Sequence, residues 1–371
     1  MIRRSPAVLV VSPCTDVRDA SVYLEAIRHG HTQLVVPRSS AQWPSGGAVR
    51  QVAVRRGNQY TQMWIRGLKQ LISETRPDLI HVHNEPWAVT SIRVLRSGIP
   101  TVLHGGENIM INAPLPTRLR RVGMSRSLRR CAGYVSWGRT GIEAALRAGL
   151  PTHTPRAVIP ASPPDPAVFR ERPIAITDAM KVVFVGRLVA EKGVDTLLDA
   201  IGSRSRRLQF DLVIVGEGPE LGRLRARAAE LGIRARFVGR LDVKGTQEAI
   251  ASSNVVVVPS IDTRVWSEQW GRVVMEAMMT GRSVLASDAG ELPHLVGNPE
   301  WMFRQGSAES LGQRLDELLD APSLLVARGR EALDRSRRFH PRLLAGQLAA
   351  FWDEALAFSA GDRRIGEVGD V

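Results

Sequence analysis

Cysteine is scarce in this sequence. The 371 residues contain two cysteines, Cys14 and Cys131, whose spacing matches no metal-binding motif. So few cysteines are typical of proteins from a reducing compartment, and they exclude a fold that depends on a disulfide framework. Nothing in the sequence requires a bond between the two.

Long apolar segments are also missing. The longest apolar runs have the length of a β-strand, so the sequence predicts no transmembrane helix. The chain opens with the basic segment MIRRSP, but the apolar run after it is too short for a signal peptide and no cleavage pattern follows. We interpret this run as the first buried strand and expect a cytoplasmic protein.

Lysine is rare, although the chain is strongly basic. Lys69, Lys181, Lys192 and Lys244 are the only lysines among 50 basic residues, and the formal net charge is +13. Such a charge suits nucleic acid, an anionic membrane surface or phosphorylated substrates, and a codon bias towards arginine would also produce it. No nucleic-acid-binding module is recognisable. The charge therefore favours phosphate-bearing ligands, and we expect no nucleic-acid partner.

What the sequence does contain is a repeated alternation of short apolar strands with helical segments. In the first half, strands are predicted at 7–12, 32–36, 78–82, 100–103 and 133–136, and helices at 17–28, 59–75, 88–97, 117–130 and 138–148. In the second half, strands are predicted at 181–185, 208–215, 235–238, 255–258 and 283–286, with two helices over 305–338 divided at Pro322. This alternation predicts an α/β protein with two Rossmann-like parallel sheets.

A proline-rich segment separates the two halves. Ile159–Phe169 contains several prolines and Pro173 follows it, so this segment cannot be helical and marks a domain boundary. We predict an N-terminal domain at 1–165, a C-terminal domain at 166–341, a final helix at 342–358 and a frayed tail at 359–371.

The segment after the fourth strand of the second half has the most distinctive pattern. Val255–Val258 is a run of four valines that ends at Pro259, and two acids, Glu268 and Glu276, follow. In open α/β sheets the ligand lies at the carboxyl ends of such strands. If one helix carried both acids, their spacing of eight residues would separate them by about 12 Å. The pair could then hold two ends of one elongated ligand.

A second candidate site follows the strand at 181–185. Arg187 and Lys192 flank a turn with glycines, and a helix begins beside them. Backbone N–H groups, the helix dipole and two cations could together neutralise a diphosphate. Taken alone, the same residues also fit a surface loop with two solvated cations.

Two further turns lie at strand ends. Gly216 and Gly218 resemble part of a dinucleotide-binding fingerprint, but Leu221 stands where its third glycine would be. An NAD site is therefore not favoured, and we expect a tight turn that touches the ligand from one side. Gly239 and Arg240 follow another strand, where backbone groups could contact a base.

Several segments in this order resemble one known family. VGRLVAEKGVDTLLDA, VIVGEGPELGRLRARAAELGI, RFVGRL and SEQWGRVVMEAMMTGRSVLASDAGELPHLV resemble the C-terminal half of the family 4 retaining glycosyltransferases, glycosyl transferases group 1. The resemblance is good over residues 181–296 and looser in the N-terminal half. It implies the GT-B fold: two Rossmann-like domains that face each other across a cleft, with the last helix crossing back to the N-terminal, acceptor-binding domain.

The resemblance also implies roles for single residues. Arg187 and Lys192 stand at positions that bind the donor diphosphate, Glu268 at a position that meets the donor sugar, and Glu276 at the ribose position. Backbone amides of Gln269, Trp270 and Gly271 would assist Glu268, and His104 would lie near the reacting sugar. Without the flanking motifs, Glu268 and Glu276 would be ordinary helix residues. His83 competes with His104, and we prefer His104 on its position.

The implied reaction moves a hexose-type sugar from a nucleoside-diphosphate sugar to a hydroxyl of a glycan, lipid-linked or small-molecule acceptor, with retention of the anomeric configuration. No Asp-x-Asp motif and no metal-ligand spacing occurs in the sequence, so we expect no metal and no cofactor. The departing phosphate would take the acceptor proton on the same face, as the resemblance implies.

Some features leave other functions open. The family's glycine-rich loop after the first strand is replaced by SPCTDVRDAS, which keeps a degenerate nucleotide-sugar-binding protein as an alternative. A sugar-nucleotide epimerase or hydrolase could use the same fold. Arginines at 117–130, including Arg118, Arg121, Arg126 and Arg129, could touch an anionic membrane at its inner face or form a solvated helix face.

Overall fold

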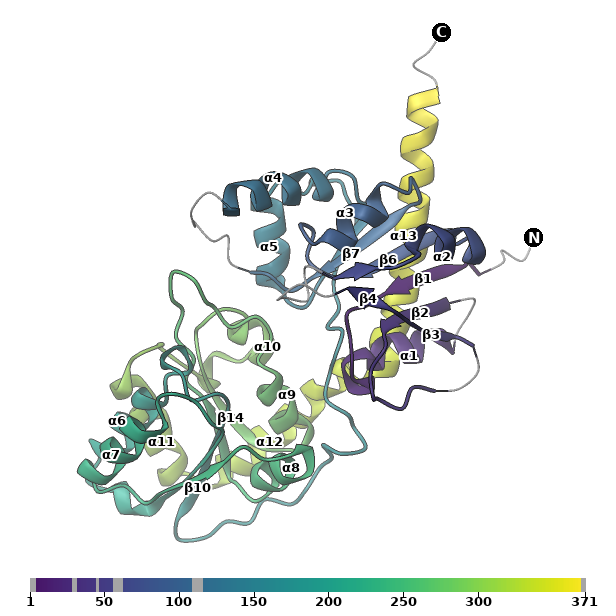
Figure 1. Ribbon diagram of the computed structural model, residues 1–371. Helices are drawn as coiled ribbons and strands as arrows, with labels where there is room; N and C mark the ends of the chain where they lie inside the picture. The colour runs from purple at the N-terminus through teal and green to yellow at the C-terminus, as the bar shows by residue number, and fades with distance from the viewer. Residues whose placement is uncertain (1–4, 29–31, 45–46, 56–62, 109–115, 368–371) are drawn as a thin grey trace. The chain divides into compact units, whose positions relative to one another are not determined.

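A computed structural model describes residues 5–28, 32–44, 47–55, 63–108 and 116–367, with the backbone alone at 116–121 and 362–367. The chain forms two compact units (Figure 1). Unit 1 contains residues 1–163 and 341–371, and unit 2 contains residues 164–340. The last segment of the chain therefore belongs to the first unit.

Unit 1 is built on a seven-stranded sheet with the order β3-β2-β1-β6-β7-β8-β9, and every pairing in it is parallel. Its central strands are rich in Val, Leu and Ile and are buried on both faces, as parallel strands covered by helices must be. The strands are β1 Val8–Val11, β2 Thr32–Pro37, β3 Val49–Val52, β6 Leu79–His83, β7 Thr101–Gly105, β8 Gly133–Ser136 and β9 Arg156–Val158.

Helices cover both faces of this sheet. One face packs against α1 (Ser21–Ile27) and α13 (Pro341–Glu367), where Tyr23, Phe351 and Trp352 join the core. The other face packs against α2 (Leu68–Thr75), α3 (Val89–Leu95), α4 (Pro116–Leu128) and α5 (Arg139–Arg147). The contact between α1 and α13 confirms that the C-terminal helix crosses back to the N-terminal fold.

Unit 2 contains a six-stranded parallel sheet with the order β12-β11-β10-β13-β14-β15. The four valines of the sequence pattern form β13 and are fully buried or nearly so. The strands are β10 Met180–Val185, β11 Phe210–Val215, β12 Ala235–Gly239, β13 Val255–Val258, β14 Ser283–Ser287 and β15 Met302–Phe303.

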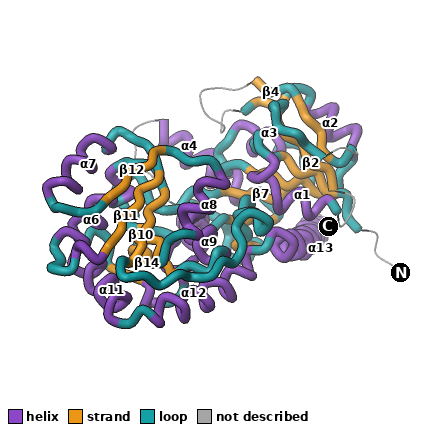
Figure 2. The backbone as a smooth tube through the Cα atoms, turned by 90° about the horizontal axis from the view of Figure 1, so that it is seen from below, coloured by secondary structure: helices purple, strands orange, loops and turns teal. Residues whose placement is uncertain are grey.

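The helices of unit 2 also form two layers (Figure 2). On one face lie α6 (Val194–Gly202), α7 (Leu221–Glu230) and α11 (Ala308–Asp320), packed on β10 and β11. On the other lie α8 (Val243–Ala251), α9 (Arg272–Met279), α10 (Leu292–Val296) and α12 (Ser323–Ser336). Pro322 divides α11 from α12, as the sequence predicted.

Some local predictions were wrong. Trp64–Ile65 forms β5, which pairs with β4 (Val54–Arg55), where a helix was predicted from residue 59; residues 59–62 lie outside the described residues. The final helix is longer than the predicted 342–358, because α13 runs from Pro341 to Glu367. The strands β3, β9 and β15 escaped prediction, since they are short and lie at the edges of their sheets.

Candidate functional site

Both sheets have the strand order of a doubly wound fold, and each has one point where the chain reverses its direction of winding. In unit 2 this point lies between β10 and β13, and in unit 1 between β1 and β6. At such a point the loops after the two strands diverge to opposite faces, which leaves a ligand site at the carboxyl edge. The topology therefore selects the loops after β10 and β13 in unit 2.

These two loops bring Lys192 and Glu268 together. The Lys192 Nζ lies 2.6 Å from Glu268 Oε2, and the Ser260 hydroxyl donates to the same oxygen at 2.9 Å. The Lys192 ammonium also lies 4.8 Å from the centre of the Trp266 ring. Glu268 is 9% exposed and Ser260 is fully buried. The carboxylate is therefore held in one orientation by a cation and a hydroxyl.

The backbone explains why Lys192 reaches this place. The 3-10 turn Ala190–Lys192 ends at Gly193, which has φ +65°. A Cβ at Gly193 would overlap the Pro259 carbonyl oxygen, so only glycine allows this approach to the loop after β13. The amide of Ile261 donates to the Glu191 carbonyl at 2.8 Å. The two loops are thus joined through their backbones.

Glu268 lies before α9 rather than on it. The helix begins at Arg272 after Gly271, which has φ +58°. The expectation of about 12 Å along one helix therefore does not apply to the pair Glu268 and Glu276. Glu268 is fixed instead by a loop contact, because a Cβ at Gly290 would overlap its carbonyl oxygen and Glu291 donates its amide to that oxygen at 2.9 Å.

Glu276 lies in α9 and is 9% exposed. Burial raises its pKa from 4.5 to about 7, and the nearby Arg272 guanidinium opposes this rise. The Arg272 Nε lies 3.3 Å from Glu276 Oε1. A buried carboxylate with a pKa near neutrality changes its charge in the physiological range, which is a frequent property of binding sites.

Arg187 follows β10 and is exposed. In the described part of the chain no carboxylate pairs with it. The turn beside it depends on two glycines, because a Cβ at Gly216 would overlap the Gly186 carbonyl and a Cβ at Gly218 would overlap that of Leu188. These glycines allow two βα turns to touch. Gly216 also has φ +141°, a backbone conformation that favours glycine.

The remaining candidates in unit 2 are more peripheral. Gly239 ends β12 with φ +73°, and its carbonyl accepts a hydrogen bond from the Gly216 amide at 2.8 Å. The next residue, Arg240, is exposed. The ring of Trp270 packs edge-on against Phe339, 5.8 Å between centroids. Gln269 is half-buried. The side chain of Trp270 therefore serves the core of unit 2.

In unit 1, the candidate His104 lies in β7 and is 1% exposed. Burial lowers its pKa well below 6.5, and the neighbouring His83 and His81 lower it further. His83 ends β6, its pKa falls to about 4 through burial, and its ring centroid is 5.1 Å from that of His104. Both rings are neutral at pH 7, so they act as hydrogen-bonding groups.

Several polar residues at these sheet edges escaped the sequence analysis. Glu85, just after β6, is buried. This burial and the nearby Glu107 raise its pKa to about 7. Its Oε1 accepts from the Gly106 amide at 2.9 Å. Ser260 and Trp266 in unit 2 were also missed. In the sequence, only their position within ten residues after a buried strand could have indicated them.

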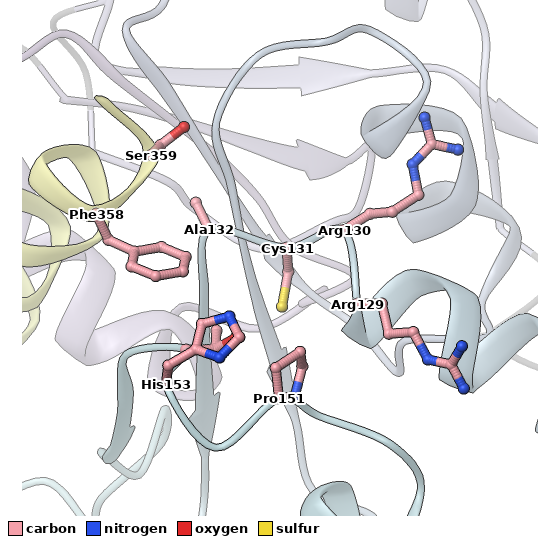
Figure 3. A pocket seen from close by; sticks show the side chains of 9 residues that line it. Arg129, Arg130, Cys131, Ala132, Pro151, His153, Phe358 and Ser359 are labelled. Atoms are coloured by element: carbon pink, nitrogen blue, oxygen red, sulfur yellow. The ribbon is translucent and has the colours of Figure 1, made fainter. Parts of the chain in front are cut away.

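A cavity of about 260 Å³ lies elsewhere in unit 1 (Figure 3). It is lined by Cys131 and Ala132 just before β8, by Pro151 and His153, and by Phe358 of α13. The ring of Phe358 lies 5.8 Å from that of His153. Because residues before β8 mark the amino edge of a parallel sheet, this cavity is distinct from the sites at the carboxyl edge.

The described residues contain no helix that is long and apolar enough to cross a membrane. Both cysteines are free and buried. Burial raises the pKa of Cys14 and of Cys131 to about 12, so both remain thiols at neutral pH.

About half of the sequence is similar to known proteins. Residues 169–335 match the family Glycosyl transferases group 1. The D-inositol 3-phosphate glycosyltransferase of Corynebacterium aurimucosum is 31% identical over 195 residues, which are 49% of this chain and 44% of that protein. The phosphatidyl-myo-inositol mannosyltransferase of Mycobacterium leprae is 33% identical over 186 residues, 46% of each. The chain spans less than half the length of these relatives.

Solved structures share the fold over most of the chain. Sucrose-phosphate synthase from Thermosynechococcus elongatus has a TM-score of 0.70 at 19% identity, covering 96% of this chain and all (100%) of that one. Anabaena HepE, solved in complex with UDP, has a TM-score of 0.69 at 17% identity, covering 93% and 99%. With its two parallel α/β sheets, the chain has a GT-B-like fold.

Proposed function

From the match of residues 169–335 to the family Glycosyl transferases group 1, we propose that the whole protein is a retaining, metal-independent glycosyltransferase of this family. It moves a hexose-type sugar from a nucleoside-diphosphate sugar to a hydroxyl acceptor. The observation that carries the proposal is the Lys192–Glu268 pair, which lies within the matched segment at the carboxyl edge between β10 and β13.

Unit 2 would bind the donor. Arg187 and Lys192 are the cations for the diphosphate, because an exposed guanidinium and an ammonium at the start of α6 both suit phosphate oxygens. Glu268 would accept hydrogen bonds from hydroxyls of the donor sugar, and Glu276 would accept those of the ribose. Backbone groups of Gln269, Gly271 and the Gly239–Arg240 turn would complete the contacts to sugar and base.

The ion pair between Lys192 and Glu268 fits a site in which the lysine contacts the diphosphate and the glutamate contacts the sugar. The lysine neutralises the carboxylate in the absence of donor and, once a diphosphate is bound, can lie between the carboxylate and a phosphate oxygen. During transfer the bond from the anomeric carbon to the phosphate oxygen breaks. The acceptor oxygen bonds to the same face of that carbon, and its proton goes to the departing diphosphate, whose charge Arg187 and Lys192 stabilise.

The first experiment is a donor panel. UDP-, GDP- and ADP-sugars are added to the protein, and its melting temperature and the release of nucleoside diphosphate are measured. A ligand at about 100 times its Kd should stabilise the fold by about 2.7 kcal/mol. Lys192→Met should lose most of this effect, whereas Lys244→Met, a lysine of α8, should retain it. If no donor stabilises the wild-type protein or is consumed, the proposal is wrong.

Product analysis separates transfer from its alternatives. An epimerase would change the nucleotide sugar without an acceptor, and a hydrolase would release free sugar at the same rate with or without one. A transferase consumes the donor faster when an acceptor is present, and the new product carries the mass of both. A protein that binds donors and converts none would be a nucleotide-sugar-binding protein.

We also propose that the basic segment formed by α4 and the arginines directly after it contacts anionic lipid or a phosphorylated acceptor. Arg126 and Arg129 are exposed, while the side chains of Arg118 and Arg121 lie outside the described residues. Flotation with vesicles of anionic or neutral lipid, in low and high salt, tests this. Binding to anionic vesicles that salt abolishes, and that Arg126→Ala with Arg129→Ala weakens, is the expected result. Equal behaviour with neutral vesicles would refute it.

A further inference from the structure

Among the described residues, one ring nitrogen of His104 has no hydrogen-bond partner. Its Nε2 is buried and makes no hydrogen bond within the described structure. The nearby Ile159 carbonyl partly offsets the lowering of the His104 pKa. Its geometry does not, however, make a hydrogen bond with His104 Nε2. A buried polar atom that makes no hydrogen bond destabilises the folded state. A site that binds a polar ligand offers a reason for such a cost, and the chemistry depends on whether Nε2 carries a proton.

A chain of hydrogen bonds that begins in the C-terminal helix answers this question. The indole of Trp352 in α13 lies with its Nε1 3.1 Å from His81 Nδ1. An indole N–H can only donate, so the His81 Nδ1 must accept and carries no proton. Burial keeps His81 neutral by lowering its pKa well below 6.5. The single proton of His81 therefore lies on its Nε2.

The next link fixes His104. The Nε2–H of His81 lies 3.2 Å from His104 Nδ1 and 3.4 Å from the Tyr23 hydroxyl. That hydroxyl lies 2.8 Å from the same His104 Nδ1. Burial raises the Tyr23 pKa well above 10, so the hydroxyl keeps its proton. The hydroxyl can donate or accept, but the His81 Nε2–H can only donate, and it lies against His104 Nδ1. We therefore infer that His104 Nδ1 accepts and that the neutral His104 ring carries its proton on Nε2.

We propose that Tyr23, His81 and Trp352 are positioning residues that hold His104 in the Nε2–H tautomer, so that this N–H donates to an oxygen of the sugar being transferred. This inference rests on the proposed function, since a sugar hydroxyl is the acceptor it names. It also gives α13 a role beyond packing: the helix that returns to unit 1 supplies the donor at the start of the chain.

The tautomer can be measured directly. In protein labelled with ¹⁵N-histidine, NMR correlations distinguish a protonated from a bare ring nitrogen, and the loss of one ring's signals in His104→Gln assigns them. We expect His81 and His104 each to show a protonated Nε2 and a bare Nδ1. A His104 ring with its proton on Nδ1 would overturn the inference.

Two conservative variants then test the link to the reaction. Tyr23→Phe removes the hydroxyl, and Trp352→Phe removes the indole N–H together with part of the ring; both keep a six-membered aromatic ring. We expect Tyr23→Phe to lower kcat about 2- to 10-fold, the loss of a neutral hydrogen bond, and the double variant to lower it further with a mixture of His104 tautomers. The affinity for nucleoside diphosphate should not change, because unit 2 would bind it.

Matched controls lie in the same unit. Tyr134→Phe removes a buried hydroxyl that has no hydrogen-bond partner among the described residues, and Trp43→Phe removes an indole that donates to Ser39 at 3.2 Å. Neither should affect kcat or the tautomer. If the double variant keeps the wild-type tautomer and kcat, the inference fails. If the wild-type protein converts no nucleotide sugar, the proposed function fails, and the spectra alone then decide the tautomer.

Discussion

The charge of Glu276 should make donor binding depend on pH. Burial raises its pKa to about 7, and hydroxyl groups of a ribose donate better to a carboxylate than to a neutral acid. If only the ionised form accepts the ribose, the affinity rises with pH and levels off above the pKa. At pH 6 about one molecule in ten is ionised, so the apparent affinity should be roughly tenfold lower than at pH 8.

Calorimetry with an intact nucleotide sugar is the appropriate measurement. The terminal phosphate of a free nucleotide titrates at about pH 6 and would add its own pH dependence, whereas the diphosphate of a nucleotide sugar is esterified at both ends. Titrations from pH 5.5 to 8.5 in buffers with different ionisation enthalpies should show that binding releases a proton below pH 7. The isosteric variant Glu276→Gln should bind with one affinity at every pH and should approach the wild type at the acidic end.

The same carboxyl group should also affect stability. The folded protein keeps the Glu276 proton between pH 4.5 and about 7, while the unfolded chain loses it. Since the unfolded state then binds fewer protons, the free energy of unfolding falls as pH rises through this window. The full effect of this one group is about 3 kcal/mol. Glu276→Gln should therefore unfold at a higher temperature than the wild type at pH 8, and the two should converge near pH 4.5.

Two results would refute this reasoning. Wild-type affinity that is constant from pH 6 to 8 would show that Glu276 is not the ribose acceptor or that its pKa is not raised. A pH dependence that persists in Glu276→Gln would assign the titration to another group.

Two structural predictions concern unit 2. Arg282 is fully buried and donates to the carbonyls of residues 172, 173 and 251, so Arg282→Met should lower the free energy of unfolding by about 3 kcal/mol or more. The control Arg337→Met, at an exposed position, should change it by less than about 0.5 kcal/mol. Equal midpoints of the two variants in urea denaturation would contradict this prediction. In Gly216→Ala the new Cβ would overlap the Gly186 carbonyl, so donor affinity and stability should both fall. The control Gly222→Ala in α7, with nothing within 4 Å of its Cβ, should stabilise the fold by up to about 1 kcal/mol. A higher melting temperature for Gly216→Ala than for Gly222→Ala would refute this prediction.

Much of the architecture followed from local patterns. The run Val255–Val258 became a buried parallel strand, because four consecutive β-branched residues fit a strand covered on both faces. Pro322 divided two helices, because its ring excludes a continuous helix. Where the local signal was weak, prediction failed: Trp64–Ile65 pairs with a strand that precedes it by about ten residues, and only that pairing makes it β-structure.

The sequence by itself determined which residue types stand at the ends of buried strands, and with them the family resemblance and the candidate residues Lys192, Glu268 and Glu276. Only the tertiary structure decided their relations. Lys192 and Glu268 are 76 residues apart and form an ion pair, because the chain crosses the sheet between β10 and β13 and Gly193 lets the two loops touch. The proton on His104 depends likewise on Trp352, which no local pattern connects to it. Spacing along the chain sets local conformation, while burial, pKa and the direction of hydrogen bonds arise from neighbours that folding brings together.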